Sequence, residues 1–166
     1  VFHHNNCKVL DVNRGTMLRT ADENLKELTE LSGKAGIPVA VENVGIKAMG
    51  NVLLEQEAFI AECRKLSNPV LIDIGHAHAN HWDLRHVMEE LKDRIISYHV
   101  HNNDGVHDCH QRIYNGTLDM NAFLNDVREL TPEADLVLEY APDVAEDLAG
   151  IMEDIKTLCL FRETLS

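Results

Sequence analysis

Short apolar runs alternate with longer amphipathic segments along the whole chain. Within runs such as Ile37–Val44, Pro69–Ala77 and Ile95–Val100, most apolar residues are consecutive instead of alternating with polar ones. Strands that are covered on both faces carry this pattern, and parallel sheets are covered in that way. We therefore expect parallel strands at 37–44, 69–77, 95–100 and 134–141, preceded by the tail of a strand at 1–4.

The segments between these runs predict helices. Thr20 can cap a helix because Glu23 follows three residues later, and Gly33 and Gly36 are expected to end it. The regular alternation predicts an α/β fold in one domain, residues 1–166, without linker or internal repeat. Further helices are expected at 53–66, 83–93, 120–130 after the cap Asp119, and from Asp143 to about Phe161.

Each predicted strand ends in an ionisable or metal-ligating side chain. A buried carboxylate without a partner is costly, so five such placements in succession need a common reason. In a parallel α/β barrel the carboxyl ends of all strands lie on one face, where active sites form. We therefore expect these side chains to converge on one metal site. In chain order they are His3 and His4, Glu42, Asp73, His99 and His101, and Glu139.

The ligand types narrow the metal but leave some assignments open. Carboxylates together with imidazoles suit Mn²⁺, Zn²⁺, Fe²⁺ or Co²⁺. His99 and His101 stand two apart on a strand and share a face, so either can be the ligand, with His99 favoured. Asp104 before Gly105 is typical of a turn. The histidines interpreted as non-ligands are His78, His81, His86 and His107.

Composition and charge exclude several classes of protein. With 166 residues, 45% of them apolar, the chain can form a sizeable core. A net charge of −13 disfavours nucleic acid as a partner, and no apolar run approaches the roughly 20 residues that span a bilayer. The four cysteines are far apart, which predicts reduced thiols in a cytoplasmic protein. The first residue is Val, so we expect the natural chain to begin upstream.

Four segments carry a resemblance to a known family. VAVENVG, VLIDIGHAHA, YHVHNNDGVHDCH and LVLEY, within Val39–Tyr140, resemble the xylose isomerase-like TIM-barrel superfamily. That superfamily holds sugar and sugar-phosphate isomerases and epimerases, and also endonuclease IV. The resemblance implies a (β/α)8 barrel of which this chain is the C-terminal portion, with the last five β/α units. About 100 residues would then lie upstream, or a partner chain, such as a second copy, would complete the sheet.

The isomerase branch implies one divalent metal ion, Mn, Co, Mg or Zn, and a small sugar as substrate. By resemblance, Glu42 and Glu139 are also the acid/base pair that moves a proton beside a carbonyl, through an enediolate. His76 and Asn43 would contact the substrate. The implied metal ligands are Glu42, Asp73, His99 and Glu139.

Two other interpretations remain open. Endonuclease IV uses three zinc ions, and its pattern implies additional ligands for attack of a metal-activated hydroxide on a phosphodiester. The sequence departs from the family by Tyr114 in place of a glycine that usually precedes Gly116, and by Asn102 where Asp is frequent. A non-catalytic truncated barrel is the third interpretation. The additional ligands implied are His4 or His3, His76, His101, Asp108 and His110.

Overall fold

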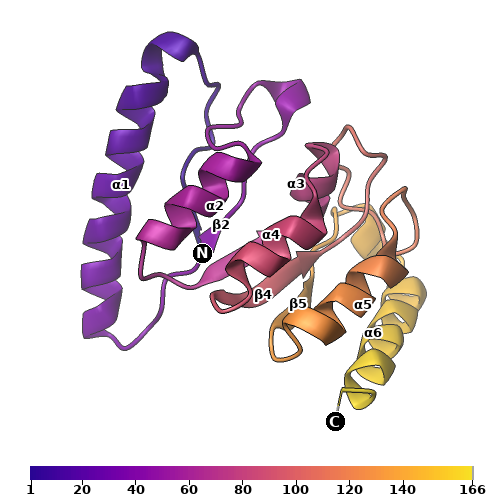
Figure 1. Ribbon diagram of the computed structural model, residues 1–166. Helices are drawn as coiled ribbons and strands as arrows, with labels where there is room; N and C mark the ends of the chain where they lie inside the picture. Colours follow the sequence, from indigo (N-terminus) through magenta and orange to yellow (C-terminus); the bar gives the residue numbers. More distant parts are fainter. Residues whose placement is uncertain (166) are drawn as a thin grey trace.

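The computed structural model describes residues 1–165 and places five strands in one parallel sheet (Figure 1). The strands follow one another in chain order, which confirms the predicted α/β fold. The first and last strands are open edges, so the described residues form part of a barrel and not a closed one. The strands are β1 (Phe2–His3), β2 (Val41–Glu42), β3 (Val70–Asp73), β4 (Ile95–Val100) and β5 (Asp135–Leu138).

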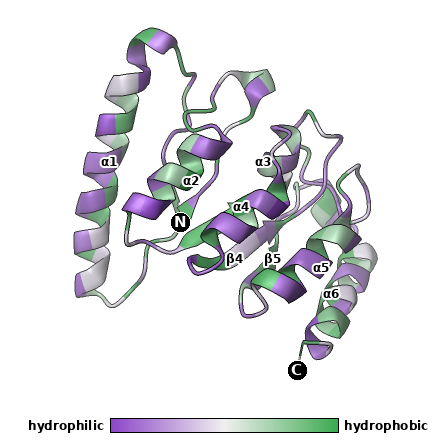
Figure 2. Cartoon of the chain, in the orientation of Figure 1, coloured by the Kyte–Doolittle hydropathy of each residue, from purple (hydrophilic) through white to green (hydrophobic). Residues whose placement is uncertain are grey.

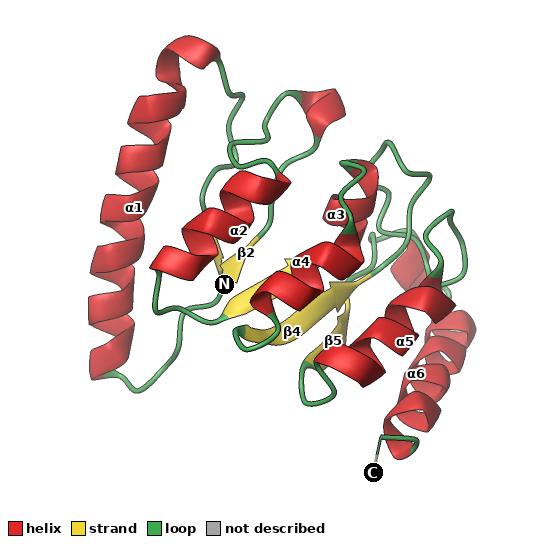
Figure 3. Ribbon diagram, viewed as in Figure 1, coloured by secondary structure: helices red, strands yellow, loops and turns green. Residues whose placement is uncertain are grey.

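The longer helices lie side by side on one face of the sheet (Figure 3). α1 stands at one end of this row and α6 at the other, as in Figure 1. None of the described helices combines the length and apolarity needed to cross a bilayer. The helices are α1 (Asp11–Lys34), α2 (Gln56–Lys65), α3 (Ile74–Ala79), α4 (Leu84–Leu91), α5 (Met120–Leu130) and α6 (Leu148–Glu163), with 3-10 turns η1 (Lys47–Met49) and η2 (Val144–Glu146).

The hydrophobic core lies between the sheet and this row of helices. The ring of Tyr98 on β4 meets Phe123 of α5 edge to face, with ring centroids 5.1 Å apart. Val87 and Met88 of α4 are fully buried in the same cluster. Hydrophobic and hydrophilic bands accordingly alternate along α4 and α5 (Figure 2). Each such side chain contributes about 1.5–3 kcal/mol when it is fully buried.

The first helix begins ten residues before the predicted start. It starts at Asp11, so Thr20 lies in its interior and is not the cap. The start is held by the Leu10 N–H, which donates to Asn13 Oδ1 at 2.9 Å. The apolar periodicity did not predict residues 11–20 of this helix, because the helix buries only Ala21 and Leu25. The end was predicted correctly, with Gly36 at φ +69° after Lys34.

Other strand and helix boundaries also differ from the predicted ones. Strand β3 ends at Asp73 instead of Ala77, because the Asp73 carboxylate accepts the His76 N–H at 2.6 Å and caps α3. The last helix is capped by Asp147 and not Asp143, which opens only the turn η2. The strand predicted at 37–44 pairs only over Val41–Glu42, β5 ends at Leu138 instead of Ala141, and α2 begins at Gln56 instead of Leu53.

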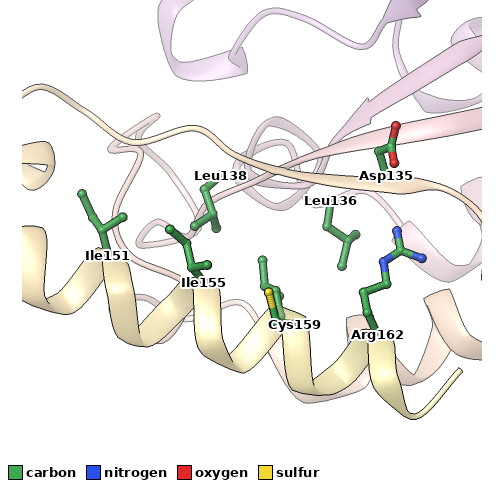
Figure 4. A pocket seen from close by; sticks show the side chains of 8 residues that line it. Asp135, Leu136, Leu138, Ile151, Ile155, Cys159 and Arg162 are labelled. Atoms are coloured by element: carbon green, nitrogen blue, oxygen red, sulfur yellow. The ribbon is translucent and has the colours of Figure 1, made fainter.

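The open edge at β5 leaves an apolar groove against α6. It has a volume of about 580 Å³, and Figure 4 shows Leu136 and Leu138 facing Ile151, Ile155 and Cys159 across it. Closed barrels remove such edges by pairing the last strand with the first. All four cysteines are free, as their spacing predicted.

The buried hydroxyl of Tyr98 generates a test of the core. It lies 2.8 Å from Thr131 Oγ1, and both residues are buried. Tyr98→Phe leaves the threonine hydroxyl unpaired, so we expect the free energy of unfolding to fall by about 1–2 kcal/mol in urea titration. Tyr114→Phe is the matched control, because Tyr114 is 53% exposed. Equal stability of the two variants would contradict this description of the core.

Candidate metal centre

The register of the parallel strands gathers the candidate residues at one end of the sheet. His3 pairs with Glu42 across β1 and β2, and Asp73 pairs with His99 across β3 and β4. Glu139 follows β5 directly, where Val100 pairs with Leu138. The predicted convergence of strand ends is therefore present in the structure. The four residues proposed as metal ligands each offer one ligand atom, and these atoms lie within 4.8 Å of one another.

His99 stands at the centre of this group. Its Nδ1 lies 2.9 Å from Glu42 Oε1, 3.2 Å from Glu139 Oε2 and 3.9 Å from Asp73 Oδ2. Burial alone would lower the pKa of His99, but hydrogen bonds to Glu139 and Glu42 raise the pKa to about 10. Without a metal ion, a proton on His99 thus holds the carboxylates together. A divalent ion would replace that proton.

Glu42 is a buried carboxylate held in its charged form. Its two oxygens are taken by separate imidazoles, His3 Nε2 at 2.7 Å and His99 Nδ1 at 2.9 Å. Burial would raise the pKa of Glu42, but the hydrogen bonds from His3 and His99 outweigh it and lower the pKa to about 2. The carboxylate is therefore ionised throughout the physiological pH range, as a metal ligand must be.

Asp73 is fully buried and is held by its neighbours on three sides. Its carboxylate accepts the His76 N–H and lies 3.0 Å from His101 Nε2. Burial favours the neutral acid, but the charge of His76 and the hydrogen bond from His101 lower the pKa of Asp73. Its backbone pairs with the Asn43 amide, through Asn43 Nδ2 to Asp73 O at 2.9 Å and Asp73 N to Asn43 Oδ1 at 2.8 Å.

This pairing bears on the expectation that Asn43 contacts the substrate. Asn43 is 2% exposed, and both polar atoms of its amide are engaged by the Asp73 backbone. Its side chain therefore adds two hydrogen bonds between the ends of β2 and β3. The sequence signal was the position of an amide directly after Glu42, but a lone sequence does not reveal whether such an amide faces the cavity or the neighbouring strand.

A second group of ligating side chains lies beside the first. His76 Nε2 lies 3.2 Å from Asp108 Oδ2, and His110 Nε2 lies 3.2 Å from Asp108 Oδ1. These three residues form a potential ligand set of their own. Burial would lower the pKa of His76, but the charges of Asp73 and Asp108 raise it to about 10. The Nδ1 atom of His76 also lies 2.9 Å from the carbonyl oxygen of Asn43, the residue after Glu42. His76 therefore links the second group to the strand end that carries Glu42.

The loop after β4 is tied to the rest of the site by close packing. His110 has a left-handed backbone with φ +43°, and its ring stacks on the fully buried His101 with centroids 3.8 Å apart. A Cβ on Gly75 would lie 1.9 Å from a His101 ring carbon, so only glycine fits there. His110 Nδ1 contacts the Glu139 carbonyl at 3.0 Å, and this contact joins the loop to the end of β5.

The other histidines separate into two kinds. His3 faces Glu42, whereas the next residue, His4, points to the opposite side and contacts the Phe2 ring, because neighbouring residues of a strand alternate. His4 is thus not brought into the potential ligand groups of the described residues, and His3 lines the cavity and contacts Glu42 without belonging to one of those groups. A third potential ligand group, His101, His110 and Glu139, overlaps the first two and includes the predicted additional ligand His101. The four histidines interpreted as non-ligands, His78, His81, His86 and His107, lie outside all three groups.

Sequence reasoning missed the asparagines that shape the loops. The Asn102 amide donates to the carbonyls of Ile113 and Leu118, and Asn103 Nδ2 donates to the Gly75 carbonyl at 2.8 Å. A neighbouring expectation is confirmed, since Asp104 accepts backbone N–H groups of the turn that follows it. The adjacent pair of asparagines after β4 was the available signal for these buried amides.

A cavity of about 500 Å³ opens above the two groups, and its chemistry suits a divalent ion. Three carboxylates and one imidazole are the donor types that Mn²⁺, Co²⁺ and Zn²⁺ accept. The ligand atoms of these four residues also lie close together, within 4.8 Å of one another. Glu42 and Asp73 are buried, while the Glu139 side chain is 44% exposed and lines the cavity together with Glu42. The residues therefore fit a metal ion that has an open side for a ligand.

The sequence matches a family model described as xylose isomerase-like TIM barrel over residues 3–160. It is 24% identical to an uncharacterised protein of Methanocaldococcus jannaschii, over 95% of this chain and 60% of that protein. A solved D-tagatose 3-epimerase-like protein shares the fold, with TM-score 0.74, 19% identity, and coverage of 98% of this chain and 61% of that one. IolI protein with a bound zinc atom has TM-score 0.72 and 18% identity, over 97% and 60%. The chain thus spans about 60% of the length of these relatives.

The shared proton at His99 generates a titration test. In metal-free protein, NMR of the imidazole protons should give His99 a pKa of about 10. Glu42→Gln removes one of its two carboxylate partners, so we expect the pKa to fall by about 1 to 3 pH units. Glu55→Gln, at an exposed glutamate paired with Lys47, is the control and should leave His99 unchanged. A His99 pKa near 6.5 in the unmutated protein would contradict the described geometry.

Proposed function

We propose that this chain, which belongs to the xylose isomerase-like TIM-barrel family, binds one divalent metal ion and takes part in sugar isomerisation or epimerisation. The family match bears out the resemblance carried by the segments within Val39–Tyr140. The observation that supports the reaction is the group of two glutamates, one aspartate and one histidine at the strand ends. The structural neighbours named for an epimerase and for a bound zinc atom agree with it.

In this proposal Glu42, Asp73, His99 and Glu139 hold the ion. Mn, Co, Mg and Zn are the candidates, and zinc has the additional support of its presence in the IolI structure. When bound, the ion would polarise a substrate carbonyl and stabilise negative charge that develops on its oxygen. The ligand residues contribute rigidity, because Glu42 and Asp73 are buried and hydrogen bonded on several sides.

The proton transfers are assigned to the two glutamates. One oxygen of each glutamate lies near His99 Nδ1, at 2.9 Å for Glu42 and 3.2 Å for Glu139. One glutamate takes the proton from the carbon beside the carbonyl, and the electron pair of the C–H bond forms the enediolate. Return of a proton to the neighbouring carbon gives isomerisation, and return to the opposite face of the same carbon gives epimerisation. His76, which lines the cavity, would orient the substrate oxygens.

The second group favours one alternative function, metal-dependent phosphodiester hydrolysis as in endonuclease IV. His76, Asp108 and His110 can hold another ion beside the first. The net charge of −13 weighs against a DNA substrate, because phosphate backbones are bound through clustered Lys and Arg. The open sheet edges keep a third interpretation, a partial barrel that binds metal without turnover, as the outcome if neither activity is found.

Glu139 gives the direct test of proton transfer. Metal-loaded chain should incorporate solvent deuterium at the carbon beside the carbonyl of the ketose it accepts, measured by mass spectrometry. Glu139→Gln should lower this rate about 10²- to 10⁴-fold, because the amide cannot act as a base. Glu133→Gln, at an exposed glutamate before β5, should retain full rate. Unchanged incorporation in Glu139→Gln would exclude the acid/base role.

The hydrolase alternative has its own assay. We expect zinc-loaded chain to leave a DNA duplex with an abasic site intact, measured by gel electrophoresis under conditions where authentic endonuclease IV cleaves it. Cleavage that is lost in His110→Ala would instead assign the second group to phosphodiester hydrolysis and would displace the isomerase proposal.

A further inference from the structure

We infer that Asp154 of α6 is a positioning residue that holds two separate parts of the site in place. The part of this inference that concerns metal binding rests on the proposed function. Asp154 is 3% exposed, and it is not a member of the potential ligand groups among residues 1–165. One of its partners belongs to the strand end that carries Glu139, and another belongs to the loop that carries His110.

The first partner is the hydroxyl of Tyr140, which donates to Asp154 Oδ2 at 2.8 Å. Glu139 and Tyr140 follow the last paired residue of β5, Leu138. Neighbouring side chains of an extended segment point to opposite sides, so Tyr140 reaches α6 while Glu139 lines the cavity. The Glu139 N–H donates to the Val100 carbonyl at 3.3 Å, a longer bond than the usual length of about 2.9–3.0 Å. The bond from Tyr140 to Asp154 therefore adds the restraint that the weakly paired strand end needs.

The second partner is the guanidinium of Arg112, which follows His110 by two residues. Its Nε and Nη2 donate to the two oxygens of Asp154, at 2.8 and 3.0 Å. Such a bidentate pair fixes the plane of the guanidinium as well as its position. Asp147, which caps α6, and Glu153 also accept from Arg112, at 3.1 and 3.2 Å. The loop after β4 is therefore attached to the first turns of α6.

The backbone of this loop needs such an attachment at His110. Its φ of +43° lies in the left-handed region, which residues other than glycine adopt at a cost and keep only where their surroundings hold them. The His110 carbonyl accepts the Ala141 N–H at 3.0 Å, and the His110 Nδ1 lies 3.0 Å from the Glu139 carbonyl. Asp154 secures both of the segments that meet in this contact.

The first turn of α6 leaves room for the guanidinium. A Cβ on Gly150 would lie 2.0 Å from Arg112 Nη1 and 2.1 Å from Asp147 Oδ2. The guanidinium therefore lies directly over the helix backbone, where only glycine leaves enough space. Asp154 stands four residues after Gly150 on the same buried face of the helix. This glycine thus lets Arg112 come within reach of the buried carboxylate.

Another arginine network in the chain provides a comparison. Arg85 of α4 donates to Asp126 and Glu129 of α5, so one guanidinium again joins two elements. Both elements are helices that cover the sheet, whereas Arg112 joins a helix to the loop that carries His110. Removing one carboxylate from each network therefore separates a general loss of stability from an effect on the site.

The test uses Asp154→Asn, with Asp126→Asn in the Arg85 network as the matched control. In metal-free protein, hydrogen exchange followed by NMR should show the Ala141 N–H opening about tenfold more readily in Asp154→Asn, relative to the N–H groups of β3, and unchanged in Asp126→Asn. Co²⁺ titration, followed by visible absorption, should give about tenfold weaker binding to Asp154→Asn only, the lower end of the loss that a missing outer partner causes at metal sites.

Gly150→Ala tests the same attachment without removing a charge. The new Cβ would displace the Arg112 guanidinium, so we expect faster exchange of the Ala141 N–H in this variant also. Gly33→Ala is its control, because a Cβ at that position of α1 meets nothing within 4 Å.

The contrary results are distinguishable. Exchange of the Ala141 N–H in Asp154→Asn at the rate of the unmutated chain would overturn the inference, whatever the metal affinity. Faster exchange with unchanged Co²⁺ affinity would overturn the role of Asp154 at the metal and leave it as a structural ion pair. If the unmutated chain binds no Co²⁺, the proposed function falls, and the exchange of the Ala141 N–H alone decides whether Asp154 holds the two segments.

Discussion

The site depends on the burial of two carboxylates, Glu42 and Asp73, at the ends of neighbouring strands. Ionised groups are stable in such positions only when charged or polar partners surround them. Glu42 is hydrogen bonded to two imidazoles. Asp73 is hydrogen bonded to His101 and to a backbone N–H of the helix that it caps. The parallel register supplies these partners, because it sets strand ends from distant parts of the sequence side by side.

Neutral groups hold this charged centre without changing its charge. The Asn43 amide pairs with the backbone of Asp73, and Asn103 pairs with the Gly75 carbonyl. Gly75 in turn leaves room for the His101 ring, which stacks on His110. Packing and the hydrogen bonds of side-chain amides therefore hold the ligand side chains in position within the described residues. A bound metal ion would find its ligands already in place.

Much of this was predictable from the sequence, and the limits have physical reasons. Apolar runs located all five strands, and the rule that strand ends meet located Glu42, Asp73, His99 and Glu139 at one place. Whether His3 or His4 faces Glu42 depends on which residues of β1 point to each side of the sheet. The sequence of a two-residue strand does not indicate this. The start of α1 was missed because its first turns bury no apolar face, and the role of Asn43 depends on a partner 30 residues away.

The proposed function depends on the binding of one divalent ion by Glu42, Asp73, His99 and Glu139. Crystals grown with Mn²⁺ and measured at a wavelength of strong anomalous scattering test it directly. We predict one strong anomalous peak per chain, within about 2.0–2.4 Å of side-chain atoms of Glu42, Asp73, His99 and Glu139. No peak at this position, or a peak held only by His76, Asp108 and His110, would contradict it.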